Sequence, residues 1–224
     1  MLNKRTRALL IFARKPVPGM VKTRLVPPLS PGQAARLYDC MLADVLARTA
    51  VDTQFDRFLF YEDVCGARDY FAGRTAGIIS LPQQGNDLGE RMLAAFRTVL
   101  ALEYAAAVVI GSDAPDLPVH FIARAFEVLE SGACEVVFGP CEDGGYYLLG
   151  MTNFYPALFR NVPWSSDEVL AVSLERAKEA GIAACLLPIW HDVDRAGDLE
   201  RAELLDKRNG AWHTRKFLRK LKKI

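Results

Sequence analysis

The sequence predicts an α/β protein with a single, mainly parallel sheet that carries helices on both faces. Short apolar runs rich in β-branched residues alternate with longer segments of helical periodicity, and this alternation is typical of βαβ units. The length of 224 residues suits one large domain. Polar and glycine-rich segments follow several of the predicted strands. Because ligands of such sheets bind beyond the carboxyl ends of the strands, we expect the functional site there.

The predicted strands are short apolar runs. The clearest is 106–111, a run of alanine, valine and isoleucine that ends directly at turn residues. The full set of predicted strands is 7–13, 58–61, 77–81, 106–111, 135–139 and 184–189.

Prolines and potential caps mark the helix starts. Pro31 opens a predicted helix of about 18 residues with one apolar face. Asp87 and Glu90 form a potential capping box for a helix that runs to about residue 103, and Ser165 with Glu168 form a second. Further helices are predicted over 121–129 and 195–207.

Composition argues against several classes of protein. No apolar run reaches the roughly 18 to 20 residues that a membrane-spanning helix needs. The N-terminal segment has a basic opening but an apolar core of only about six residues, which predicts a first strand rather than a signal peptide. Five scattered cysteines without a C-x-x-C pair do not support a zinc site or a disulfide framework. We therefore expect a cytoplasmic protein.

Charge is distributed unevenly along the chain. Residues 207–224 hold eight Lys or Arg and no acid, which leaves 20 of the 28 basic residues against 27 acidic ones elsewhere. We therefore divide the chain into a domain, 1–206, and a basic tail, 207–224, and expect no nucleic-acid binding. Phe217, Leu221 and Ile224 recur at helical spacing in the tail. The tail is expected to pack on the acidic body or fray, and contact with an anionic membrane surface is the alternative.

The loop after the first strand concentrates positive charge. In ARKPVPGMVKTRL, residues 13–25, the cations Arg14, Lys15, Lys22 and Arg24 accompany a turn shaped by Gly19 and two prolines. Fixed backbone N–H groups together with Lys and Arg side chains can hold a phosphate. The spacing is not that of a Walker A loop. The alternative is a solvated basic loop without a ligand.

An acidic turn follows the clearest strand. In GSDAPDLP, residues 111–118, Asp113 and Asp116 stand at a strand end, where carboxylate oxygens can hold Mg²⁺ or Mn²⁺ against phosphates. We assign Asp113 to the metal. For Asp116 we expect the ordinary role of capping the helix that begins near Pro118.

A second acidic turn contains two glycines. In GPCEDGGYYLLG, residues 139–150, Glu142 and Asp143 precede Gly144 and Gly145, which permit close backbone approach to a ligand. Tyr146 is a candidate for stacking on a sugar or base. The alternative is a tight β-turn between two strands, and both can be true together.

Three further segments contribute candidates. In DVDRAGDLERA, Asp192 and Asp194 alternate and would face the same side of a strand, so that one could complete a metal site with Asp113; helix capping is the alternative. In QQGNDLGERM, Asn86 and Asp87 could line the pocket, although capping explains most of that stretch. Trp164, in PWSSDEVL, is either a lid over the pocket or a core residue.

Taken in order, these segments resemble a family of bacterial glycosyltransferase-A-like proteins related to phospholactate guanylyltransferase and the molybdenum-cofactor guanylyltransferases. The resemblance covers about residues 7–205 and is most specific in ARKPVPGMVKTRL and GPCEDGGYYLLG. It implies a Rossmann-like nucleotide-diphospho-sugar transferase fold. It also implies that Lys22 and Arg24 handle phosphate, that Asp113 binds metal, and that Asp194 is a second metal or phosphate-site ligand. The sequence departs from the family at Arg195-Ala196, where Thr-Pro is usual.

The resemblance leaves two reactions open. In glycosyl transfer from a nucleotide-sugar to a small-molecule acceptor, Asp143 or Glu142 would be the general base, and the metal with Lys22 and Arg24 would neutralise the leaving diphosphate. In nucleotidyl transfer from an NTP to a phosphorylated substrate, the same cations would stabilise pyrophosphate. The carboxylates of the E-D-G-G turn favour glycosyl transfer. A nucleotide-binding protein without catalytic activity is a third hypothesis.

Overall fold

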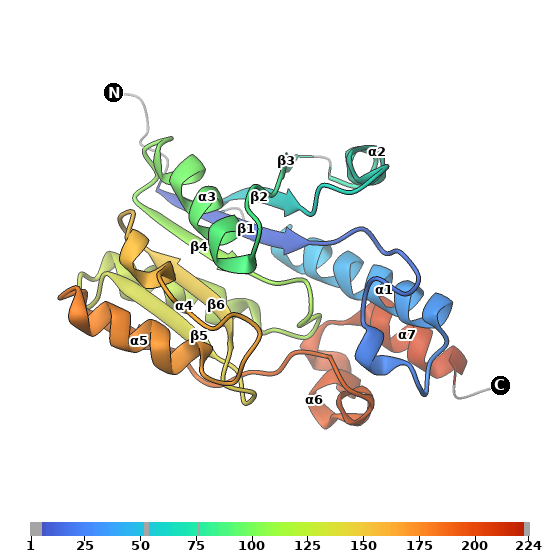
Figure 1. The fold of residues 1–224 in the computed structure, drawn as a ribbon. Helices are drawn as coiled ribbons and strands as arrows, with labels where there is room; N and C mark the ends of the chain where they lie inside the picture. Colours follow the sequence, from blue (N-terminus) through green and yellow to red (C-terminus); the bar gives the residue numbers. More distant parts are fainter. Residues whose placement is uncertain (1–5, 52–53, 76, 222–224) are drawn as a thin grey trace.

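The computed structural model describes residues 6–51, 54–75 and 77–221 and shows a seven-stranded sheet (Figure 1). Its order is β3-β2-β1-β4-β6-β5-β7. Among the described residues, β6 alone runs antiparallel to its neighbours. The predicted mainly parallel sheet is therefore confirmed. The strands are β1 (Arg7–Ala13), β2 (Asp56–Tyr61), β3 (Ile79–Pro82), β4 (Ala106–Ile110), β5 (Val136–Pro140), β6 (Tyr146–Met151) and β7 (Ala184–Leu186).

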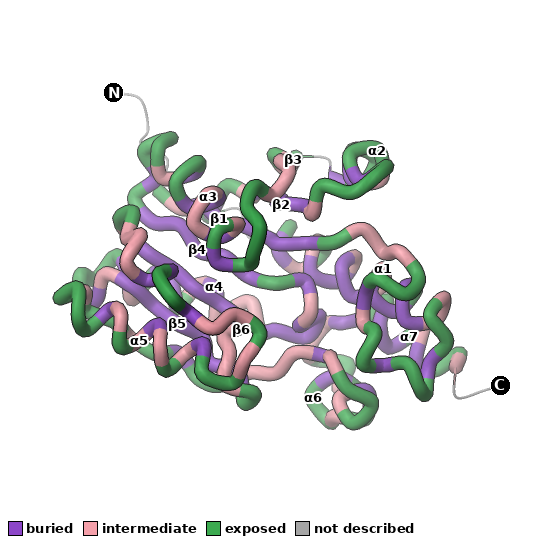
Figure 2. The backbone as a smooth tube through the Cα atoms, in the orientation of Figure 1, coloured by how far each residue is buried: buried purple, intermediate pink, exposed green. Residues whose placement is uncertain are grey.

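Helices cover both faces of the sheet, and alternate residues of β1 supply both layers of core. Leu9 and Ile11 pack on one face with Phe126, whereas Leu10 packs on the other face with Phe96. As a result, the central strands are buried along their length (Figure 2). The first face is covered by α1 (Pro31–Thr49), α2 (Ala67–Ala72) and α4 (Val119–Glu130), and the second by α3 (Leu88–Leu100) and α5 (Val169–Glu179).

The N-terminus of α1 follows directly from its sequence. The Ser30 hydroxyl accepts a hydrogen bond from the Gln33 backbone N–H (3.2 Å), and the Gln33 side chain accepts one from the Ser30 N–H (2.8 Å). At α3, Asp87 accepts from the Glu90 N–H as predicted (2.8 Å), but the Glu90 carboxylate accepts from the Asn86 N–H (2.8 Å). The predicted capping box at α3 is therefore only half formed.

One predicted helix start is wrong, and another predicted helix is interrupted. Ser165 lies in the left-handed region (φ 71°), α5 begins only at Val169, and its N-terminus has no side-chain cap. The predicted helix over 195–207 is split, because Arg201 adopts an extended ψ of 136°. The split leaves a 3-10 turn, Ala196–Glu200, and a short α6, Ala202–Leu205. Further 3-10 turns are Thr23–Leu25, Pro156–Phe159 and Lys207–Asn209.

The basic tail packs on the body through α7 (Trp212–Leu221). Figure 1 shows α7 beside α1, and Leu218 is buried with Leu37 and Met41 of that helix. Asp44 of α1, which is 3% exposed, accepts hydrogen bonds from the backbone N–H groups of His213 (2.9 Å) and Thr214 (2.8 Å). A carboxylate from α1 therefore caps α7. Of the three apolar tail residues in the prediction, Ile224 lies outside the described residues.

Replacing Asp44 by alanine is expected to release α7 from α1. The two N–H groups would lose their acceptor, and the free energy of unfolding should fall by about 1–2 kcal/mol. Asp44→Asn keeps an oxygen acceptor and should lose less. Hydrogen exchange of the α7 amides is the measurement. Unchanged protection in Asp44→Ala would show that apolar packing alone holds the helix.

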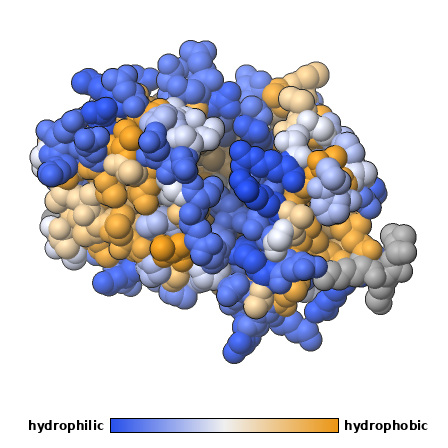
Figure 3. All heavy atoms as spheres, turned by 60° about the horizontal axis from the view of Figure 1, so that its bottom comes forward, coloured by the Kyte–Doolittle hydropathy of each residue, from blue (hydrophilic) through white to orange (hydrophobic). Residues whose placement is uncertain are grey.

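The described residues contain no helix long and apolar enough to cross a membrane. On the side of the molecule shown in Figure 3, hydrophilic side chains form a band between two areas of apolar surface.

Candidate functional site

Lys22 forms the centre of the site. It adopts a left-handed backbone conformation (φ 49°, ψ 41°) before the turn Thr23–Leu25, and its side chain is 6% exposed. Its Nζ atom lies 2.7 Å from Oδ1 of Asp113 and 3.7 Å from Oδ1 of Asp194. Backbone conformations of this kind cluster at active sites, although turns such as that at Ser165 also adopt them. The structure thus brings together three residues that the sequence analysis singled out.

The carboxylates come from two segments that are joined by backbone contacts. Asp113 follows β4, and its carbonyl oxygen accepts a hydrogen bond from the Val193 N–H (2.9 Å). This bond holds the 192–194 segment beside the end of β4. Arg24 donates to Oδ2 of Asp194 (2.7 Å). β1 and β4 are neighbours in the sheet, and the chain continues from them in opposite directions, to β2 and to β5. The cluster therefore lies beyond the carboxyl ends of these two strands, where the sequence predicted the site.

Charges within the cluster shift one another's pKa values. Burial alone would lower the pKa of Lys22, but the negative charges of Asp113, Asp192 and Asp194 outweigh it and raise that pKa. Burial, followed by the charge of Asp113, raises the pKa of Asp192 to about 7, although Lys22 opposes the shift. The charge of Asp192 is therefore coupled to those of the cluster. The alternation of Asp192 with Asp194 in the sequence pointed to both residues, but we assigned only Asp194 to the metal site.

Tyr38 contacts both the first loop and the acidic turn 111–118, and the sequence did not predict it as a site residue. Its hydroxyl accepts a hydrogen bond from the Arg14 N–H (2.8 Å) and lies 2.6 Å from Oγ of Ser112, which precedes Asp113. The ring is 3% exposed, and burial raises the pKa of its hydroxyl. In the sequence Tyr38 is one more member of the buried face of a helix, so no pattern distinguishes it.

Asp113 and Asp194 are the candidate metal ligands. Among the described residues, no group of three or more His, Cys, Asp or Glu side chains could hold a metal. Mg²⁺, however, commonly takes one or two carboxylates and completes its shell with water and substrate phosphates. The Lys22 ammonium lies between these carboxylates, so an incoming cation would have to displace it.

The other predicted phosphate-binding residues have contacts elsewhere. The Arg14 guanidinium lies 3.6 Å from Glu62, and Lys15 donates to the Cys65 carbonyl (2.9 Å). Both partners belong to the segment after β2. Gly19 has a φ of 79°, which a turn of this kind requires. A phosphate role for Arg14, Lys15 and Gly19 therefore stays a prediction.

The E-D-G-G turn lies within electrostatic range of the cluster. Asp143 is exposed, and its Oδ1 accepts a hydrogen bond from the Gly145 N–H (3.1 Å). The Asp143 charge contributes to raising the pKa of both Arg24 and Asp192. Glu142 lies with its Oε2 3.3 Å from Nδ1 of His191. The charge of Asp143 therefore acts on the cluster, whereas the contact of Glu142 is with His191.

Several residues assigned to a ligand pocket have packing contacts instead. A Cβ on Gly144 would lie 1.9 Å from the Asp167 carbonyl oxygen, so the close approach is to the protein's own backbone. The Tyr146 ring packs against Phe138 with centroids 5.4 Å apart. A sugar-binding role for Gly144 and Tyr146 gains no support from these contacts.

Trp164, Asn86 and Asp87 also serve the start of α3. The Trp164 ring lies so close to Gly89 that a Cβ there would approach it to 2.2 Å. Asn86 donates its side-chain amide to Glu90 (3.0 Å), and Asp87 caps the helix. Capping therefore accounts for Asn86 and Asp87, and packing accounts for Trp164.

Asp116 does not cap α4, so the predicted capping role is wrong. Pro118 is the N-cap of that helix and has no side-chain cap bond. Asp116 is fully buried, with its Oδ1 3.7 Å from Nη2 of Arg201. Burial raises the pKa of its carboxyl, and Arg201 opposes the shift.

Comparison with solved structures defines the class of protein. A Desulfovibrio desulfuricans G20 protein described as a "putative nucleotide-diphospho-sugar transferase" is 29% identical, with a TM-score of 0.86 over 97% of this chain and 95% of that chain. The same fold is found in CMP:2-keto-3-deoxy-manno-octonic acid synthetase in complex with CTP (16% identity, TM-score 0.60, 91% and 99% covered). It is also found in molybdopterin-guanine dinucleotide biosynthesis protein A of Archaeoglobus fulgidus (13%, 0.59, 90% and 99%). The chain is a transferase of the nucleotide-diphospho-sugar transferase fold.

The family is shown by a match over residues 45–166, more than half of the chain. The chain belongs to this family, described as "uncharacterized protein conserved in bacteria (DUF2064)". A comparison with curated proteins finds no match.

Proposed function

We propose that this transferase moves a glycosyl group from a nucleotide-sugar to a small-molecule acceptor and depends on Mg²⁺ or Mn²⁺. The observation that carries the proposal is the buried Lys22, held between Asp113 and Asp194 beyond the ends of β1 and β4. Two carboxylates and a cation at one point suit a diphosphate bound through a metal ion.

The chemistry follows from charge. Mg²⁺ or Mn²⁺ on Asp113 and Asp194 would supply positive charge to the departing nucleoside diphosphate. Lys22, freed from its carboxylates, would bind the same diphosphate as a point charge. Arg24, 61% exposed, would add a planar donor pair at the open side of the site. These groups stabilise charge that develops as the glycosidic bond breaks.

Asp143 is the proposed general base. An acceptor hydroxyl must lose its proton as it attacks, and an exposed carboxylate at the rim of the site can accept that proton. The hydrogen bond from the Gly145 N–H fixes the direction of the Asp143 side chain (3.1 Å). A phosphate nucleophile would already be ionised and would need no base.

Nucleotidyl transfer is the second candidate. It is favoured by the first-loop sequence ARKPVPGMVKTRL, which resembles the family related to guanylyltransferases. Lys22 and Arg24 would then stabilise pyrophosphate that leaves an NTP, and a phosphorylated substrate would attack in line.

A thermal-shift panel separates the two reactions. NTPs and UDP-, GDP- and dTDP-sugars are compared with and without Mn²⁺, and a ligand at about 100 times its dissociation constant should stabilise by about 2.7 kcal/mol. We expect Mn²⁺-dependent shifts with one class of nucleotide-sugar. Shifts with NTPs alone would overturn glycosyl transfer.

Asp113→Asn tests the metal assignment in the same assay. The variant should lose the Mn²⁺-dependent part of the shift, because an amide oxygen is a far weaker ligand than a carboxylate. Asp69→Asn, which removes the same charge on α2, is the matched control and should keep the full shift. An unaltered Mn²⁺ effect in Asp113→Asn would refute the assignment.

A further inference from the structure

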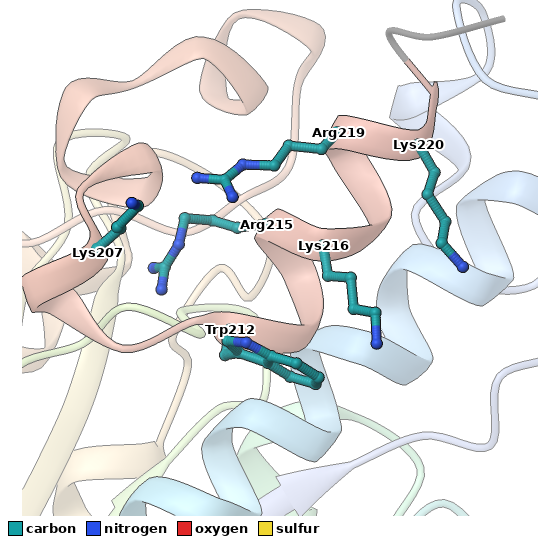
Figure 4. Close-up of a pocket in the computed structure, with 6 residues that line it drawn as sticks. All are labelled: Lys207, Trp212, Arg215, Lys216, Arg219 and Lys220. Carbon is teal, nitrogen blue, oxygen red and sulfur yellow. The ribbon is translucent and has the colours of Figure 1, made fainter.

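A pocket lies on the C-terminal segment, and none of its residues belongs to the acidic cluster around Lys22. The pocket has a volume of about 430 Å³ and is formed by the turn Lys207–Asn209 together with α7 (Figure 4). Five of the six lining side chains are cationic, and none is acidic. The lining residues are Lys207, Trp212, Arg215, Lys216, Arg219 and Lys220.

Arg215 is a fixed part of this pocket. It is 6% exposed and donates to the carbonyl oxygens of Asp206 (3.0 Å) and Gly210. In Figure 4 the end groups of Lys207, Arg215 and Arg219 gather on one side of α7. The nearest carboxylate in sequence, Asp206, is paired with Arg208 (2.6 Å). It is therefore engaged by a cation outside the pocket.

Trp212 adds an aromatic surface beside these cations. Its side chain is 56% exposed, and the Lys216 ammonium lies 4.5 Å from the ring centroid. An indole ring and several cations in one concavity suit a ligand that combines negative charge with a planar or apolar part.

The packing of α7 decides between a membrane and a soluble ligand. A helix that lies in a membrane surface inserts its apolar face among the lipids. In this protein the apolar face of α7 packs on the domain: Leu218 is buried against α1, and Phe217 and Leu221 pack on the hydrophobic cluster between the two helices. What α7 presents outward is the cationic pocket rather than an apolar stripe.

We propose that this pocket binds a soluble, phosphorylated small molecule with more than one negative charge. Lys207 and Arg219 bind the phosphate oxygens, the buried Arg215 contributes a fixed positive charge, and Trp212 contacts the organic part. The pocket is separate from the proposed transfer site at Lys22. A ligand here would therefore act as an effector or be a bound product, rather than the donor at the metal site.

The test uses inorganic pyrophosphate and the fluorescence of the full chain. The chain has three tryptophans, and Trp212→Phe isolates the signal of the pocket. We expect a saturable change in emission that is absent from Trp212→Phe and weakens with salt. Lys207→Gln with Arg219→Gln, both at exposed positions, should raise the apparent dissociation constant at least about tenfold.

Two controls make the test specific. Lys178→Gln removes one exposed positive charge from α5 and should leave pyrophosphate binding unchanged. Asp113→Asn should also keep the Trp212 response, so that failure of the proposed transfer reaction is distinguishable from failure of this site. The proposal is overturned if the Trp212 signal does not respond to pyrophosphate, or if the double variant and Lys178→Gln behave alike. A Trp212 response to phosphatidylglycerol vesicles alone would also overturn it, in favour of a membrane surface.

Discussion

Replacing Lys22 by methionine is expected to change metal binding and catalysis in opposite directions. Without the ammonium, Asp113 and Oδ1 of Asp194 become open to a cation, while Arg24 keeps its contact with Oδ2 of Asp194. Mn²⁺ should therefore bind the nucleotide-free protein about tenfold more tightly. Turnover should nevertheless fall about 100- to 1000-fold, because a buried positive charge beside the leaving diphosphate is lost. The two results together would show that Lys22 exchanges its carboxylate partners for phosphate during the reaction.

Calorimetric titration of Mn²⁺ and steady-state turnover measure the two effects. The Asp113 and Asp194 side chains are 40% and 37% exposed, so water screens their charges and Lys22→Met should stay folded. Arg24→Met is the matched control: its guanidinium is 61% exposed and contacts Asp194 alone of these carboxylates, so both changes should be smaller. Weaker Mn²⁺ binding in Lys22→Met would contradict the competition between ammonium and metal.

Gly144→Ala is expected to cause a large loss of stability. Its φ of 84° costs an alanine about 1–2 kcal/mol. The added Cβ would also lie 1.9 Å from the Asp167 carbonyl oxygen, which is inside van der Waals contact. The Gly144 carbonyl accepts a hydrogen bond from the Leu170 N–H (2.9 Å), so a shift of the turn would disturb the start of α5. We expect a total loss of about 3 kcal/mol or more from the free energy of unfolding.

Gly181→Ala provides the control for this variant. Gly181 also has a positive φ, 67°, but nothing lies within 4 Å of a Cβ built there. Its replacement should therefore cost only the backbone penalty, about 1–2 kcal/mol. Chemical denaturation of both variants isolates the contribution of the contact with Asp167. Equal losses of unfolding free energy in the two variants would show that the E-D-G-G turn and the 163–168 loop can move apart without an energetic penalty.

Much of the fold was predictable because it depends on local patterns. β1 has the predicted bounds, 7–13, and α1 begins at Pro31 as expected. Hydrophobic periodicity and a proline at the first helical position report short-range preferences that the tertiary structure did not override. The short helix α2 was not predicted, because Ala67–Ala72 is too brief for periodicity to identify.

The site was predictable in its members but not in its connections. The position of Asp113 after a buried strand, and of Lys22 in a basic loop, was visible in the sequence. Capping and packing explain Asn86, Asp87 and Trp164, which the sequence also offered as pocket residues. Turn, cap and ligand site use the same residue types, so a single sequence cannot separate them.

The sequence by itself therefore determined the class of fold, the edge of the sheet that carries the site, and the identity of the main charged groups. Only the tertiary structure decided that Lys22 turns inward between Asp113 and Asp194, through a left-handed backbone conformation that no local propensity favours. It also decided that Asp44 caps α7, which holds the basic tail against the rest of the domain. In both cases the partners lie far apart in the chain, and long-range contacts of this kind depend on how the sheet and its loops pack.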